Sequence, residues 1–250
     1  MTNRLKILPE KSKEIVDQKK PIVLGDYIGG GSEYNVFALG QEGHVIKVPK
    51  AWWHTKEAYD VQADLCELQE NAVPILDTEV LENQPVQSGN EVWTPPYVIV
   101  QKRSNLPTLD ATHLQIECIR AQLSKLLQIS VNLFKDKNVA IDFLGAEAMV
   151  GLMKYFISPS YPLHVHNFHL NHNAEILLLD TGLLNPEKCK PFLRWGISEI
   201  INLQHYLIEG VVQTLDDDFK LENFDPSILV RFTGFSMLTA TSIWSGFKRD

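Results

Sequence analysis

Three glycines and a lysine are the first residues whose types and spacing could do chemistry. Gly29, Gly30 and Gly31 stand between two apolar runs, where the backbone can approach a ligand that a Cβ would exclude. The exposed N–H groups of such a turn suit phosphate oxygens. After a second turn at 40–43 the chain reaches Lys47 on the next apolar run. This order predicts either a phosphate-binding turn with an ammonium on the neighbouring strand, or a plain hairpin turn.

A second candidate is the acid at the end of an apolar run. Asp180 follows the apolar residues 176–179, and Gly182 comes two positions later. A carboxylate at the end of a buried strand is costly unless it coordinates a cation or accepts hydrogen bonds. We therefore expect Asp180 to have a partner of one of these kinds.

The glycine turn and its lysine together resemble a known family. The pattern G-x-G-x-x-x-x-V followed by a strand lysine resembles the phosphate-covering loop and phosphate-binding lysine of the protein-kinase-like superfamily, which includes aminoglycoside-type phosphotransferases. Gly29, Gly31, Val36 and Lys47 match that motif. Tyr34 replaces the usual third glycine, which should stiffen the loop or change how closely it covers the phosphates. The resemblance implies that ATP is bound here.

The family pairs this lysine with a carboxylate on the single helix of its small lobe. Asp64 and Glu67 are the candidates here, and Glu57 fits less well by its distance along the chain. Asp64 has the better spacing, whereas Glu67 has the commoner residue type. The resemblance leaves this choice open.

The same resemblance assigns the metal and the adenine contacts. The triplet 180–182 resembles the D-F-G segment of kinases, with Thr181 in the Phe position, so Asp180 would hold magnesium against the nucleotide phosphates. Asn167, thirteen residues upstream, matches the second metal ligand. Both would have to reach one ion from adjacent strands. Gln101 lies in an extended segment that fits the adenine-binding hinge.

The catalytic base is where the sequence departs from the family. The aspartate expected five residues before Asn167 falls on Pro162, which cannot accept a proton. Asp142 follows the long predicted helix at the distance of a kinase catalytic loop, and in that register 146–156 is an inserted helix. The alternative is a pseudokinase without a base, which binds nucleotide or serves as a scaffold. Because positioning and charge neutralisation dominate phosphoryl transfer, loss of the base does not exclude activity.

The same region is compatible with two other chemistries. His164 and His166 would share one face of a strand, and with His169 and His172 they could form a zinc or iron site. Partly exposed loop histidines are the favoured interpretation. The triplet 180–182 also matches the active site of retroviral-type aspartic proteases, in which two carboxylates share a proton, but this chain has one copy and would need a homodimer.

The elements that must position these residues change in type along the chain. Short β-rich runs at 22–28, 34–39, 44–48, 75–81 and 97–101 are interrupted by one amphipathic helix that carries Ala58, Val61, Leu65 and Leu68. Later segments predict helices at 116–131, 146–156, 190–215 and 226–244, and strands at 164–170 and 175–179. We expect an α+β, bilobal protein-kinase-like fold. It would have an N-terminal extension (1–20), a small antiparallel β-rich N-lobe with one helix (21–103) and a larger helical C-lobe (104–250).

Composition and charge argue against some classes of function. The 250 residues are 44% hydrophobic and carry a net charge of −8, which argues against a nucleic-acid surface. The apolar runs are too short to span a membrane, and residues 1–20 lack an apolar signal core, so a cytoplasmic protein is expected. The three cysteines are far apart and predict reduced thiols. The resemblance therefore implies an ATP- and magnesium-binding phosphotransferase of unknown acceptor, or a silent kinase-like module that acts on a protein partner.

Overall fold

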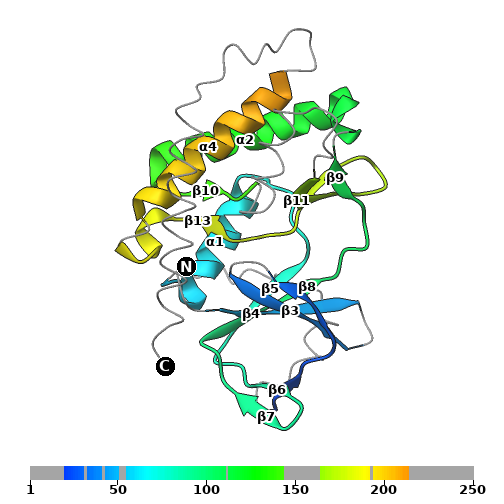
Figure 1. Ribbon diagram of the computed structural model, residues 1–250, viewed down its shortest axis with the longest axis vertical. Coiled ribbons are helices and arrows are strands. Elements are labelled where there is room, and N and C mark those ends of the chain that lie inside the picture. The colour runs from blue at the N-terminus through cyan, green and yellow to red at the C-terminus, as the bar shows by residue number, and fades with distance from the viewer. Residues whose placement is uncertain are drawn as a thin grey trace, which may run out of the picture. The chain divides into compact units, whose positions relative to one another are not determined.

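A computed structural model describes residues 20–30, 33–40, 43–50, 55–110, 112–143, 164–191 and 194–213 (Figure 1). The chain forms two compact units, one of Met1–Leu109 with His166–Leu183 and one of Asp110–Val165 with Leu184–Asp250. This division differs from the one expected at 103/104, because 166–183 groups with the β-rich unit. Its strands pair there with residues near 108 and bridge to Ile75. The helices expected at 146–156 and 226–244, and Pro162, lie outside the described residues.

The first unit is built on a five-stranded antiparallel sheet. Its order is β2 (Tyr27–Gly30), β3 (Tyr34–Leu39), β4 (His44–Pro49), β8 (Tyr97–Lys102) and β5 (Thr78–Glu82). Each strand coincides with or overlaps a predicted run. The run predicted at 22–28 is split into β1 (Ile22–Val23) and the start of β2, and Gly25 lies between them, where an added Cβ would stand 2.8 Å from the Ala38 carbonyl oxygen. The register also shifts between Tyr27 and Gly29.

Hydrophobic side chains on the two faces of this sheet form separate clusters. One face contributes a cluster that includes Ile46, Val98 and Val100. The other face contributes Tyr34, Tyr97 and Ile99, and packs against Ala58 and Val61 of helix α1. Successive side chains of β8 therefore pack alternately into the two clusters, as expected for a central strand covered on both sides.

Helix α1 (Ala58–Glu70) is the single helix predicted among the β runs. Its apolar residues Val61, Leu65 and Leu68 are almost completely buried. At its start the Asp60 carboxylate accepts a hydrogen bond from Glu57 N at 2.9 Å, which satisfies a donor at the helix N-terminus. At its end the Asn71 side-chain amide donates to the Glu67 carbonyl at 2.8 Å, and Ala72 turns into the left-handed region with φ 53°. Local capping thus fixes both ends of the helix that carries Asp64.

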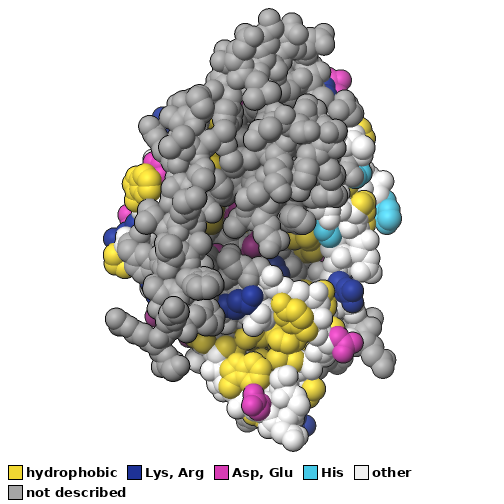
Figure 2. All heavy atoms as spheres, in the orientation of Figure 1, with side chains coloured by type: hydrophobic (Ala, Val, Ile, Leu, Met, Phe, Trp, Pro, Cys, Tyr) yellow, Lys and Arg dark blue, Asp and Glu magenta, His cyan; other side chains and the backbone are white. Residues whose placement is uncertain are grey.

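A second, smaller sheet in unit 1 was not predicted. It joins β1 (Ile22–Val23), β6 (Val86–Ser88) and β7 (Glu91–Trp93) in the order β1-β6-β7. Hydrophobic side chains are exposed on the face of unit 1 that Figure 2 presents. Val23, Val92 and Trp93 of this sheet are 65%, 55% and 39% exposed, and Tyr27 of β2 is 59% exposed. The small sheet and β2 thus carry apolar side chains that the core of unit 1 does not cover.

A hairpin completes unit 1 and carries both expected metal ligands. Strands β12 (Ile176–Leu178), β11 (His164–Leu170) and β9 (Thr108–Asp110) form a sheet in that order. Between β11 and β12, the Asn171 side-chain oxygen accepts hydrogen bonds from Asn173 N and Glu175 N, each at 2.9 Å. The strands predicted at 164–170 and 175–179 are confirmed. The tight turn sets their pairing, with Phe168 opposite Leu178.

The described part of the second unit is mainly helical. It contains η2 (His113–Gln115), α2 (Glu117–Lys137), β10 (Ala140–Ile141), η3 (Pro186–Lys188) and α4 (Arg194–Gln213), while β13 (Leu183–Leu184) lies where the chain passes between the units. Helices α2 and α4 lie side by side (Figure 1). Asn138 ends α2 in the left-handed region with φ 57°, a helix stop that a short polar side chain tolerates. None of the described helices combines the length and apolar character needed to cross a membrane.

Candidate functional site

The carbonyl group of Leu179, the residue before Asp180, accepts two side-chain donors in unit 1. Lys47 Nζ on β4 donates to it at 3.0 Å, and Gln101 Nε2 on β8 donates at 3.0 Å. Gln101 is 3% exposed and also donates to Thr78 Oγ1 at 3.1 Å. Two strands of the five-stranded sheet thereby hold the backbone immediately before the expected metal aspartate.

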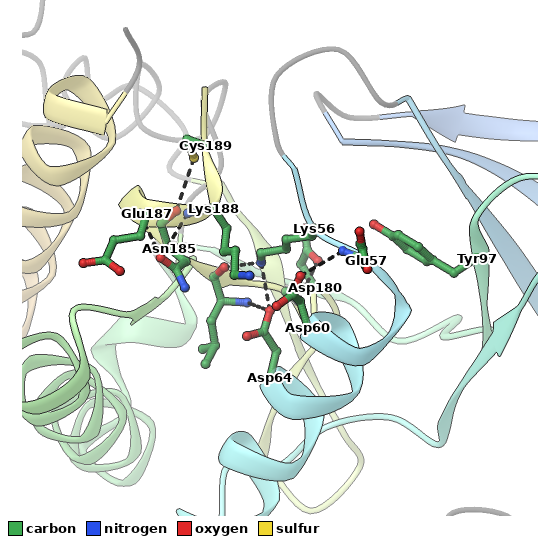
Figure 3. A network of polar contacts seen from close by, with 12 residues as sticks. Lys56, Glu57, Asp60, Asp64, Tyr97, Asp180, Asn185, Glu187, Lys188 and Cys189 are labelled. Atoms are coloured by element: carbon green, nitrogen blue, oxygen red, sulfur yellow. Dashed lines mark hydrogen bonds and ion pairs between the residues drawn. The ribbon is translucent and has the colours of Figure 1, made fainter. Parts of the chain in front are cut away.

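The other end of this segment is held by a buried ion pair. Lys56 Nζ lies 2.8 Å from Asp64 Oδ2 and donates to the carbonyl oxygen of Leu183. The same Asp64 oxygen accepts from Leu183 N at 3.1 Å. Figure 3 shows Lys56 and Asp64 pointing toward one another, with Asp180 close by. Both backbone groups of Leu183 are therefore bound by one ion pair, and residues 179–183 are fixed at both ends.

The charges around Lys56 explain why it stays protonated. Burial by itself would lower the pKa of Lys56. The carboxylate of Asp64, with those of Glu33 and Asp180, outweighs burial, and the pKa of Lys56 is raised above its usual value. A Cβ on Gly182 would stand 3.4 Å from Glu33 Oε2, 3.7 Å from Asp180 Oδ1 and 3.8 Å from Lys56 Nζ. Gly182 therefore lies close to the ammonium of Lys56 and to the carboxylates of Glu33 and Asp180.

Asn167 and Asp180 occupy neighbouring positions at one end of the β11–β12 hairpin. Leu179 N donates to the Asn167 carbonyl at 2.9 Å, so Asn167 lies opposite the residue before Asp180. The Asp180 carboxylate accepts from Gly182 N at 3.3 Å. Both side chains are half-buried. Carboxylate and amide oxygens are donors of the type that magnesium prefers, and Asp180 and Asn167 carry one of each near the same end of the hairpin.

The lysine that pairs with the helix acid differs from the expectation. Asp64 pairs with Lys56, not with Lys47, because the chain before α1 brings Lys56 to the first turns of the helix. Lys47 instead binds the Leu179 carbonyl. Glu67 accepts from the Asn71 side-chain amide at 2.9 Å, near the end of the helix. Of the two candidate acids, Asp64 is thus the one that bonds to the segment of Asp180.

The glycine turn is a β2–β3 hairpin, with Gly29 opposite Val36 and Gly30 opposite Asn35. A Cβ on Gly30 would stand 2.9 Å from the Tyr34 carbonyl oxygen and 3.0 Å from Lys50 Nζ, so close backbone approach requires glycine there. No atom lies within 4 Å of the corresponding point at Gly29. Val36 is half-buried on β3, and Gly31 lies outside the described residues.

Tyr34, at the position of the missing third glycine, has a packing role. Its ring is 5% exposed and lies edge-on to Tyr97 at 6.5 Å, with the two hydroxyl groups 3.3 Å apart. Burial raises the pKa of Tyr34, and the nearby Glu33 carboxylate adds to the shift. The start of β3 is thereby anchored to β8.

The histidines of a possible metal site and the proposed base Asp142 are the remaining candidates. His169 lies with Nδ1 2.7 Å from Ser104 Oγ and Nε2 3.5 Å from Thr108 Oγ1, and burial lowers its pKa. His172 is exposed, and nothing is described of the side chains of His164 and His166. Within the described ranges, no group of three or more His, Cys, Asp or Glu residues is placed to hold a metal. Asp142 lies in unit 2, half-buried directly after β10.

Sequence reasoning missed Lys56 and Glu33. Lys56 stands eight residues before Asp64 and just outside the helix, where the positive end of the helix dipole disfavours an ammonium. That unfavourable position is the signal that could have shown that Lys56 needs a carboxylate partner. Glu33 gives no comparable signal, because a carboxylate in a turn is ordinary.

Comparisons with known proteins give structural neighbours of low sequence identity. No protein-family model and no curated protein matches the sequence. Solved structures similar to this chain include the amicoumacin kinase hAmiN, in complex with AMP-PNP, Ca2+ and Ami. It is 10% identical, with 91% of this chain and 94% of that chain covered and a TM-score of 0.37. The choline kinase LicA from Streptococcus pneumoniae is 11% identical, with 93% and 98% covered and a TM-score of 0.37.

The α+β order of elements that the kinase-like resemblance predicts is confirmed by the chain's own strands and helices. A five-stranded antiparallel sheet with one helix precedes the long helix α2, and a β-hairpin follows with the expected asparagine and aspartate. This order defines the class of the fold.

Proposed function

We propose that the protein is an ATP- and magnesium-dependent phosphotransferase whose acceptor is unknown. One observation carries the proposal: Lys47 binds the backbone directly before Asp180, and Asn167 lies at the same end of the hairpin. Lys47, Asn167 and Asp180 are thus all linked to the backbone around Leu179 in unit 1, and they carry an ammonium, an amide and a carboxylate. These groups can neutralise and orient a triphosphate, which is the main task of a phosphotransferase.

Each residue has a proposed role. Gly29, Gly30, Gly31 and Val36 would cover the phosphates, and Gln101 lies on the strand proposed to border the adenine. Lys47 would contact the phosphates, since its hydrogen bond to Leu179 leaves two of the three ammonium protons for other acceptors. Lys56 and Asp64 would keep residues 179–183 in place. Asn167 and Asp180 would hold magnesium, which when bound would neutralise phosphate charge.

The proposed reaction transfers the γ-phosphoryl group. An acceptor hydroxyl oxygen bonds to the γ-phosphorus, and the bond from that phosphorus to the oxygen shared with the β-phosphate breaks. ADP leaves with the electron pair of that bond. The hydroxyl proton passes to a carboxylate, for which Asp142 is the proposed residue.

Hydrolysis of ATP, with water as the acceptor, tests this function without a known substrate. Release of phosphate from γ-labelled ATP in the presence of magnesium should fall at least about 100-fold in Lys47→Ala and in Asp180→Ala. The first change removes a cation that would neutralise phosphate charge, and the second removes a proposed ligand of magnesium. Lys102→Ala, which changes an exposed lysine on β8, is the matched control and should hydrolyse ATP as the wild type does. Equal turnover in all four proteins would refute the assignment.

A second candidate function is a nucleotide-binding module that transfers nothing. The observation in its favour is that Lys47 is bound to a backbone carbonyl while a different lysine pairs with the helix acid. The presence of Pro162 at the expected base position agrees with it. In that case ATP with magnesium raises the melting temperature of the protein, and no phosphate is released.

A further inference from the structure

The carbonyl oxygen of Leu179 has more hydrogen-bond donors than it needs. Lys47 Nζ and Gln101 Nε2 each donate to it at 3.0 Å. One donor is enough to satisfy a carbonyl group inside a protein, so either side chain alone would meet that need. The two donors come from neighbouring strands, β4 and β8, and lie in the same unit as Asn167 and Asp180. The bond of either donor is therefore dispensable while the other is in place.

Gln101 is held in position independently of Lys47. Its side chain is 3% exposed, and Nε2 also donates to Thr78 Oγ1 at 3.1 Å. The Thr78 hydroxyl in turn donates to the Leu76 carbonyl at 2.7 Å. An amide nitrogen carries two hydrogens, and the bonds to Thr78 and Leu179 use both. Gln101 Nε2 thus has no hydrogen left to donate to a nitrogen of the adenine ring.

Lys47 lies on the sheet face proposed for the nucleotide. It is paired with Val36 on β3 and with Ile99 on β8, and residues paired directly across antiparallel strands project from the same face. Val36 is one of the residues proposed to cover the phosphates. An ammonium that keeps its bond to Leu179 offers two protons to phosphate oxygens and stays at the carbonyl, whereas one that gives up the bond offers all three.

We infer that Gln101 is a positioning residue for Lys47: it keeps the Leu179 carbonyl bonded when Lys47 turns from that carbonyl to the phosphates of ATP. This inference rests on the proposed phosphotransferase function, and it assigns the side chain of Gln101 to the lysine and not to the base. Without Gln101, the turn of Lys47 leaves the carbonyl with no side-chain donor among the described residues, which is costly for a partly buried group. The lysine then stays on the backbone, and affinity for the phosphates falls.

Equilibrium binding tests this role without a known acceptor. The ligands are a non-hydrolysable ATP analogue with magnesium, and adenosine, which carries the base without the phosphates. Gln101→Met keeps the length of the side chain and removes both of its hydrogen bonds. Val100→Ala is the matched control for lost packing, because it trims the preceding residue of β8, which belongs to the cluster on the other face of the sheet.

Gln101→Met should raise the dissociation constant of the ATP analogue by about 10-fold, as expected when one carbonyl loses its only remaining donor. The dissociation constant of adenosine should not change, and Val100→Ala should bind both ligands as the wild type does. If Gln101→Met does not fold, Gln101→Asn takes its place, because it keeps the amide but is one methylene too short for both bonds. Weaker binding of the ATP analogue with unchanged binding of adenosine is again expected.

Thermal denaturation without nucleotide tests the sharing of the carbonyl by itself. Lys47→Met, Gln101→Met and the double variant are compared with the wild type. Because each donor substitutes for the other, Lys47→Met should lower the melting temperature further beside Gln101→Met than it does in the wild type. Equal shifts in the two backgrounds would overturn the inference, because the donors would then not substitute for one another.

The binding outcomes separate this inference from the proposed function. If Lys47→Ala weakens binding of the ATP analogue but Gln101→Met does not, the inference is overturned and the function stands. It is also overturned if Gln101→Met weakens adenosine as much as the ATP analogue, because the amide would then contact the base, or if Val100→Ala weakens the analogue equally. If Lys47→Ala has no effect on binding of the analogue, the proposed role of Lys47 fails, and the inference fails with it.

Discussion

Thr181 is a threonine in surroundings that suit an apolar side chain. It stands at the position that the resemblance assigns to the phenylalanine of the D-F-G segment, is completely buried, and its hydroxyl has no hydrogen-bond partner among the described residues. A buried hydroxyl without a partner costs about 1–3 kcal/mol, and valine has nearly the same shape. An apolar residue therefore suits this position better than threonine does.

Thr181→Val should leave the free energy of unfolding unchanged or raise it by about 1 kcal/mol. Thr78→Val is the matched control, because Thr78 is 2% exposed and its hydroxyl donates to the Leu76 carbonyl at 2.7 Å and accepts from Gln101. That change should lower the free energy by about 1–3 kcal/mol. Urea denaturation measures both. A Thr181→Val protein as destabilised as Thr78→Val would show that the Thr181 hydroxyl has a partner.

The two lysines near Asp180 should differ in what they contribute to stability. Lys56→Met leaves the buried carboxylate of Asp64 without its cation, and breaking a buried pair in this way costs about 3–5 kcal/mol. Lys47→Met should cost less, because the Leu179 carbonyl keeps the donor from Gln101. Urea denaturation of both variants checks the order. Equal losses would mean that Lys56 and Asp64 do not form the ion pair described.

At the scale of elements, the end of α1 contains a residue in an unfavourable conformation. Ala72 has φ 53°, a left-handed conformation that costs a non-glycine residue about 1–2 kcal/mol. Ala72→Gly should therefore raise the free energy of unfolding by about 1 kcal/mol. Ala63→Gly, at an exposed position inside the same helix, should lower it by about 0.5–1 kcal/mol. Thermal denaturation of the two variants should shift in opposite directions, and a shift in the same direction would contradict the left-handed stop.

Most strands of unit 1 and its helix could be predicted from the sequence, because their patterns lie within short stretches of chain. Strands β3, β4 and β8 alternate or run apolar between glycine and proline turns, and α1 repeats its apolar residues at helical spacing. The spacing of Asn167 and Asp180 predicted adjacent strands, and the pairing of β11 with β12 confirms them. Periodicity and turn residues therefore sufficed for most of this fold.

The remaining features depend on contacts that are distant in sequence. Strands β6 and β7 have three residues each, too few to show a period. The choice of Lys56 over Lys47 as the partner of Asp64 is set by the path of the chain before α1, which no local pattern encodes. The bond from Gln101 to Leu179 gave no signal either, because a polar residue near the end of a strand is ordinary until its partner is known.

At the scale of the whole molecule, both units contain a histidine that burial keeps neutral. His169 in unit 1 has its pKa lowered by burial, and burial lowers that of His205 in unit 2 from 6.5 to about 4. Unfolding exposes each ring to water, where its pKa returns to the ordinary value. The unfolded chain therefore binds protons at a higher pH than the folded chain, so acid favours unfolding.

The contribution of His205 should be fully present above pH 6.5 and should be lost as the pH falls from there through about 4. His205 Nε2 lies 2.8 Å from Ser130 Oγ. His205→Gln keeps an acceptor for Ser130 but cannot titrate, so its free energy of unfolding should fall less than that of the wild type between pH 7 and 4. His172→Gln, which changes an exposed histidine, should follow the wild type. Carboxylates titrate alike in all three proteins, so the difference between the curves isolates the ring. Parallel curves for wild type and His205→Gln would mean that His205 is not held neutral by burial against Phe134 and Phe143.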